Sequence, residues 1–286
     1  MSEVNTLMLI GSTSLKPFNV IPSANGEYRH IKNVLPCIGK IKIDSFTLQA
    51  QMLPIRNIDS TRCDVTEALA SIVEFYQVQK LIPPKKQTPV HEVLVVDNKD
   101  GLQADIDSSF MLDPLEAEPS TPNYLNHRSI LSQKISKGDP DRHQNTSFHD
   151  EDIEPIDAFN LLLEFGIEEE KAEDRKRANI TGFAKISTKD ELKQYLMEYG
   201  PAFITLPVTS HHAQFWKSDK IIVGYHACVV VGWTDKSFII RNNWGTDWNG
   251  DGHCLYSFKD FEKGIHDELW GIIDIHNLFL NKRKFN

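Results

Sequence analysis

The chain has 286 residues, 40% of them apolar and 25% charged, so it can bury the core of one large domain or two small ones. A net charge of -9 without a basic cluster argues against nucleic-acid binding. No run approaches the ~18 apolar residues of a membrane span, and the N-terminus makes a poor secretory signal. We therefore expect a cytoplasmic, non-secreted protein that contacts no membrane.

The cysteines do not suggest a disulfide framework or a metal centre. There are four of them, Cys37, Cys63, Cys228 and Cys254. They are few and scattered for a chain of this size, and no pair has the spacing of zinc ligands. Calcium is not expected at Asp247–Gly252 either, because the closing position of a twelve-residue loop is Phe258. We expect free thiols, no metal and no other cofactor.

The first half of the chain contains one clear helix. Residues 1–50 read as an N-terminal arm with short strands, the best candidate being Lys40–Ile43. Over residues 64–79 apolar side chains recur at helical spacing from Val65 to Tyr76. Asp64 precedes the first apolar residue and is predicted to be the N-cap of this helix.

A long polar segment follows that helix. Residues 97–152 are rich in Asp, Ser, Pro, Asn and His and carry few apolar anchors. A compact domain rarely contains so long a structureless loop. Two interpretations stay open: an acidic insertion that is flexible alone or ordered by a partner, and a surface loop with some helix around residues 124–136.

The second half predicts helices followed by strands. Helices are expected over 156–165 and from the capping box Thr188–Glu191 to Tyr199, and the charged run 167–177 is expected to be an exposed helix. The expected strands are Ala202–Val208, His226–Trp233, Ser237–Arg241, Gly252–Phe258 and Gly271–Ile275. Helices first and antiparallel strands afterwards indicate the α+β class with two packed lobes.

One stretch carries a chemical signal. His226 begins an apolar strand, and Asn242 ends the next strand along the chain. On adjacent antiparallel strands these side chains can meet, and the amide oxygen then fixes the tautomer and plane of the imidazole. Trp244 would lie over this hydrogen bond and keep water away from it. In a Cys-His-Asn catalytic group, His226 would be the general base and Asn242 the residue that orients it.

These residues resemble the papain-like cysteine peptidases. The family carries a His-Ala strand start, then Asn-Ser-Trp-Gly, then Trp-Gly and a further Gly-Tyr strand. This sequence has His226-Ala227, Asn242-Asn243-Trp244-Gly245, Trp248 and Gly252-His253 in the same order and spacing. The resemblance implies a papain-like two-lobe fold, with a helical lobe on the central helix and an antiparallel β-sheet or barrel lobe. The papain-like domain is placed at 51–275, with 97–152 inserted in it and 276–286 as a C-terminal tail.

The nucleophile position departs from the family pattern. An ungapped alignment that uses Glu74 as the family's glutamate ten residues after the cysteine places Asp64 at the nucleophile. The oxyanion-donating glutamine falls on Ile58, whose side chain cannot donate a hydrogen bond. Cys63 lies one residue too early, which turns a helical side chain by about 100° away from the required direction. An Asp64–His226 ion pair that keeps the old cleft closed is therefore our hypothesis.

Three functions are compatible with this pattern. The first is a catalytically inactive papain-like homologue, a pseudoenzyme that serves as a structural or partner-binding component. Such a protein could be part of a virion, since similar non-secreted sequences occur in bacteria and large viruses or phages. The second is an active cysteine endopeptidase that uses Cys63, His226 and Asn242 through a thioester acyl-enzyme. The third is a non-catalytic module that binds extended peptides in the cleft.

Overall fold

The computed structural model describes residues 29–33, 41, 43–56, 63–81, 124–130, 132, 153–170, 177–210, 212–217 and 221–276. Several predictions fall outside these ranges. They concern Ile58, Cys37, the tail 277–286, most of the arm 1–50 and most of the segment 97–152.

The described residues form helices and one large antiparallel sheet. The helices are α1 (Asp64–Leu81), α3 (Pro155–Glu164), α4 (Lys189–Glu198) and α5 (Phe258–Glu262). Short 3₁₀ turns occur at η1 (Ile31–Asn33), η2 (Gln49–Gln51) and η6 (Trp248–Gly250). The strands are β1 (Phe46–Thr47), β2 (Leu125–Asn126), β3 (Ile167–Glu169), β4 (Arg177–Lys185), β5 (Ala202–Val208), β6 (Gly224–Trp233), β7 (Ser237–Arg241), β8 (His253–Ser257) and β9 (Leu269–His276).

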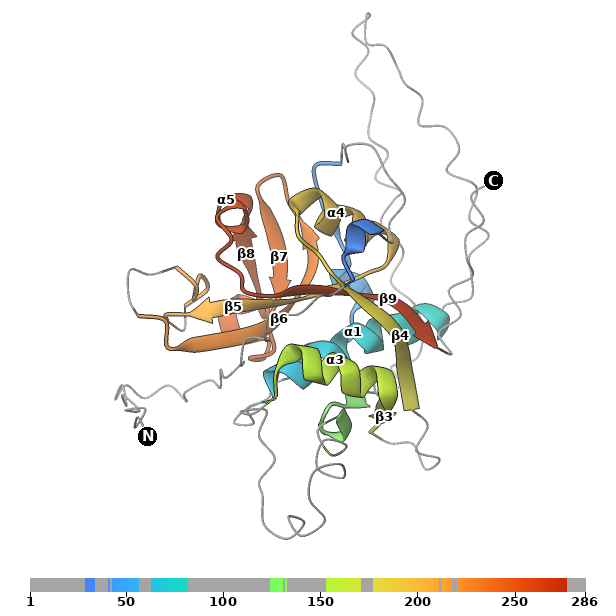
Figure 1. Cartoon of the computed structure of the whole chain (residues 1–286). Helices are drawn as coiled ribbons and strands as arrows, with labels where there is room; N and C mark the ends of the chain where they lie inside the picture. The colour runs from blue at the N-terminus through green and yellow to red at the C-terminus, as the bar shows by residue number, and fades with distance from the viewer. Residues whose placement is uncertain are drawn as a thin grey trace, which may run out of the picture.

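The sheet has the order β2-β3-β4-β9-β5-β6-β7-β8, and β1 pairs with β6. In the view of Figure 1, helices α1 and α3 lie together below strands β5 and β9, and α4 and α5 lie above them. This is the α+β arrangement that the sequence predicts, with the helix 64–79 extended to Leu81.

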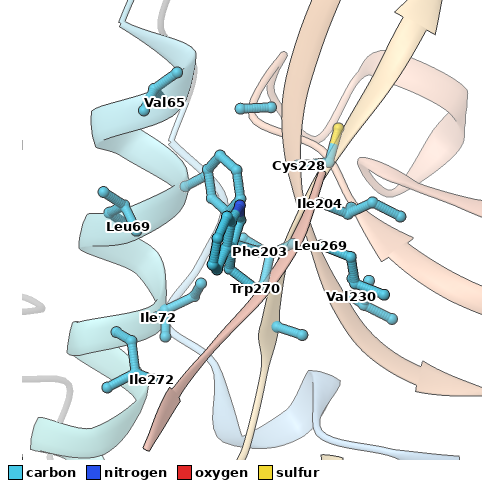
Figure 2. Close-up of a cluster of buried hydrophobic side chains, with 14 of the residues drawn as sticks. Val65, Leu69, Ile72, Phe203, Ile204, Cys228, Val230, Leu269, Trp270 and Ile272 are labelled. Carbon is cyan, nitrogen blue, oxygen red and sulfur yellow. The ribbon is translucent and has the colours of Figure 1, made fainter. Parts of the chain in front are cut away.

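The core lies where α1 packs against the middle strands. Val65, Leu69 and Ile72 project from one face of α1 toward side chains of β5, β6 and β9 (Figure 2). Phe203 and Trp270 fill the space between the helix and the sheet, and both are buried. Burying a large apolar side chain contributes about 1.5–3 kcal/mol, so this cluster fixes the position of α1 against β6.

Local sequence signals explain where the smaller helices begin. Pro155 occupies the first turn of α3, where its missing N–H costs nothing. The capping box at the start of α4 is confirmed, since Thr188 and Glu191 bind each other's backbone N–H. Helix α5, which begins at Phe258 after the capping residue Ser257, is an element that the strand prediction 252–258 missed.

Two local predictions are wrong. The charged run does not begin as a helix: Ile167–Glu169 forms β3, because Gly166 turns the chain at φ 71° and Ile167 is buried opposite Ala178. Neither Ile41 nor Ile43 lies in a strand; the arm pairs with β6 through Phe46–Thr47 instead.

The polar segment is described only in part. Its described part, residues 124–130, contains β2 and a helical turn over 128–130. Leu125 and Ile130 are completely buried, and β2 pairs with β3. This part therefore belongs to the body of the domain, and it contains some helix within 124–136, as the second interpretation predicts.

Candidate active site

The site begins at the N-terminus of α1. The carbonyl of Cys63 accepts the N–H of Glu67 at 2.9 Å and the hydroxyl of Thr66 at 3.3 Å. Cys63 therefore occupies the cap position, and Asp64 is the first residue inside the helix. This corrects the prediction of Asp64 as the N-cap by one residue. Its side chain is consequently directed to another partner.

That partner is the imidazole of His226 on β6. Oδ2 of Asp64 lies 3.0 Å from Nδ1 of His226 and also accepts the backbone N–H of Ala227 at 3.1 Å. Oδ1 of Asn242 lies 2.8 Å from Nε2 of the same ring. The structure thus brings Asp64, His226 and Asn242 into one chain of contacts, with both ring nitrogens occupied.

Strand pairing positions the histidine and the asparagine. β6 and β7 are antiparallel, with Val229 opposite Arg241, so Asn242 follows β7 on the side where β6 carries His226. The backbone N–H of Asn243 donates to Oδ1 of Asn242 at 2.7 Å and fixes the orientation of the amide. The side chain of Asn243 also reaches back to the carbonyl of Asp64 at 3.4 Å.

Aromatic rings enclose the imidazole. The Trp244 ring stacks on His226 with centroids 4.4 Å apart and an interplanar angle of 29°. Phe215 approaches the imidazole edge-on at 5.8 Å and contacts Trp244 at 5.4 Å. Trp248 packs perpendicular to Trp244 at 5.4 Å. Asp64 and His226 are both 0% exposed, so this site is closed to solvent.

Sequence comparisons identify the architecture. Residues 141–270 match the family model of the papain family cysteine proteases, a range that contains His226 and Asn242 but not Asp64. The part of the chain that carries His226 and Asn242 is therefore similar in sequence to the papain family cysteine proteases. Curated proteins yield no match to the sequence.

Solved structures show the same fold at low sequence identity. Xylellain, a cysteine protease from Xylella fastidiosa, is 14% identical with a TM-score of 0.61, over 92% of this chain and 98% of that one. Digestive procathepsin L 3 of Tenebrio molitor larval midgut is 12% identical with a TM-score of 0.53, over 81% and 70%. Procathepsin B from Trypanosoma congolense is 14% identical with a TM-score of 0.52, over 92% and 84%. The fold is papain-like.

The remaining thiols of the strands are unsuited to nucleophilic chemistry. Cys228 and Cys254 are buried in the sheet. Burial raises the pKa of each thiol, because the thiolate would have to be desolvated. No cluster of three or more potential metal ligands occurs in the part of the chain that the structure describes. Within the same residues, no helix is long and apolar enough to cross a membrane.

A buried network of charged residues lies behind the site and was missed by the sequence analysis. Arg56 contacts Glu67 at 2.8 Å and Glu74 at 2.9 Å, and both glutamates lie on the same face of α1. Arg56 also donates to the carbonyl of Leu125 at 2.9 Å, while Glu74 accepts the Leu125 N–H at 2.7 Å. The N–H and the carbonyl of Leu125, in the edge strand β2, are therefore both hydrogen-bonded to ionisable side chains. The one local signal of this network in the sequence is the spacing of seven residues between Glu67 and Glu74, which places both on the same face of a helix.

The network makes stability depend on pH through Glu74. Burial raises the pKa of Glu74 from 4.5 to about 7, although Arg56 opposes the shift. A carboxyl with a raised folded-state pKa stabilises the fold below the unfolded-state value and loses that contribution as the pH rises. We expect the free energy of unfolding to fall by up to about 3 kcal/mol between pH 4.5 and 7 from this group, since one pKa unit is worth about 1.4 kcal/mol.

Urea denaturation of Glu74→Gln at several pH values isolates this contribution. The amide keeps an acceptor for the Leu125 N–H but does not titrate. Its stability profile should lack the decrease over this range that the wild type shows. Parallel profiles for the two proteins would assign the pH dependence to other groups.

Proposed function

We propose that this chain is a catalytically inactive papain-family homologue that acts as a structural or partner-binding component. The observation that supports this most is the contact of 3.0 Å between the Asp64 carboxylate and Nδ1 of His226. A peptidase of this type needs a thiolate at that nitrogen, because the imidazole must take the thiol proton and later return it. A carboxylate at the N-terminus of α1 supplies the negative charge without the nucleophile.

Cys63 is poorly placed to take over that role. Its backbone carbonyl caps α1, while Asp64 and Asn242 occupy the two ring nitrogens of His226. No ring nitrogen is left to accept a proton from a second group. The family match also begins at residue 141, after the segment in which an active enzyme carries its nucleophile.

The predicted lack of a nucleophile can be tested with a thiol-reactive peptidyl probe and peptide mapping. The wild type should remain unlabelled at Cys63. Asp64→Cys should gain a label at residue 64, because the new thiol would lie beside His226 at the N-terminus of α1. The matched control is the double variant Asp64→Cys with His226→Ala, in which labelling should fall by at least about tenfold.

Labelling of Cys63 in the wild type that disappears in His226→Ala would establish the active endopeptidase instead. Tight binding of extended peptides without cleavage would identify a peptide-binding module and contradict a purely structural role. The proposed virion setting and protein partner rest on the sequence resemblance.

A further inference from the structure

We infer that His226 is held as a doubly protonated imidazolium with Asp64 as its buried counter-ion, so that the histidine is unable to act as a general base. This charge state deepens the function proposed above, because the Asp64–His226 pair would replace the thiolate–imidazolium pair of an active peptidase. The inference depends on the hydrogen-bond network around the ring.

The proton on Nε2 follows from the orientation of Asn242. The N–H of Asn243 donates to Oδ1 of Asn242 at 2.7 Å, which identifies this atom as the amide oxygen. An amide oxygen only accepts hydrogen bonds, so Nε2 of His226, 2.8 Å away, must carry the proton between them.

The proton on Nδ1 follows from the surroundings of Asp64. One proton must lie between Oδ2 of Asp64 and Nδ1 of His226, which are 3.0 Å apart. An imidazole is a stronger base than a carboxylate in water. The N-terminus of α1 and the N–H of Ala227, at 3.1 Å from Oδ2, further favour the anionic carboxylate.

The aromatic enclosure favours the positive charge on the ring. Trp244 presents its face to His226 with ring centroids 4.4 Å apart, and the electron-rich face of a tryptophan ring attracts a cation. The charges of Asp64 and His226 cancel inside a closed site, so neither is left as an isolated buried ion. An imidazolium has no lone pair, and His226 therefore has no capacity to take a proton from Cys63, from water or from a ligand.

Nuclear magnetic resonance of protein labelled with ¹⁵N-histidine counts the ring protons directly. We expect two protonated ring nitrogens for His226 at neutral pH, assigned by their joint loss in His226→Gln. Asp64→Asn keeps the shape of the side chain but removes its charge, and its His226 should keep the Nε2 proton and lose the Nδ1 proton. The matched control Asp235→Asn removes an exposed carboxylate and should leave both signals unchanged.

A single ring N–H on His226 in the wild type would overturn the charge assignment. If Asp64→Asn does not fold, the count in the wild type alone decides. The result is independent of catalysis: probe labelling of Cys63 would refute the proposed function, whereas a neutral His226 in an unlabelled protein would refute only the charge state.

Discussion

Replacing Asp64 by alanine is expected to lower the free energy of unfolding by about 3–5 kcal/mol, the usual cost of removing one member of a buried ion pair. The change leaves His226 buried without a counter-ion and removes the acceptor of the Ala227 N–H. In an active peptidase this position would carry the nucleophile. In this chain the Asp64 side chain would instead stabilise the fold.

Chemical denaturation in urea measures this loss. Asp235→Ala provides the control, since Asp235 and its partner Lys236 are exposed and 3.6 Å apart, and such surface pairs contribute about 0–1 kcal/mol. A loss below about 1 kcal/mol in Asp64→Ala would contradict a structural role for the pair.

Replacing Arg56 by alanine is expected to be similarly damaging, with a loss of about 3–5 kcal/mol. Arg56 is the cation that contacts both Glu67 and Glu74, and its removal deprives two buried carboxylates on α1 of their shared guanidinium, although His127 still lies 3.1 Å from Glu67. It also frees the carbonyl of Leu125, so β2 should detach from α1 before the rest of the domain unfolds.

Hydrogen exchange combined with urea denaturation tests this expectation. In Arg56→Ala the amide of Leu125 should lose protection at urea concentrations where β5 and β6 keep theirs. Lys236→Ala, which removes an exposed cation, is the matched control. Equal protection of Leu125 in both variants would show that apolar burial alone holds β2.

The sequence predicts the site better than it predicts the segments around it. His226, Asn242 and Trp244 lie in one continuous motif whose strand pairing is local, so counting residues was sufficient to place them together. The register from Glu74 back to Asp64 runs along a single helix, which has fixed geometry. Both inferences depend only on the regular geometry of one helix and of two strands that are adjacent in the sequence.

The failures involve contacts between distant segments. The charged residues of β3 favour a helix and obscure the single buried Ile167, whereas its strand character depends on pairing with both β2 and β4. The enclosure of His226 by Phe215 and the pairing of Arg56 with α1 join residues that no local pattern connects. Local propensity cannot reveal interactions that only the tertiary fold creates.

We propose that the protein has no peptidase activity. The most direct test is to incubate the wild type, Cys63→Ser and His226→Ala with a peptide library and to measure cleavage products by mass spectrometry. We predict that all three give the same background. Cleavage by the wild type that is lost in both variants would show that Cys63 and His226 form a working catalytic pair.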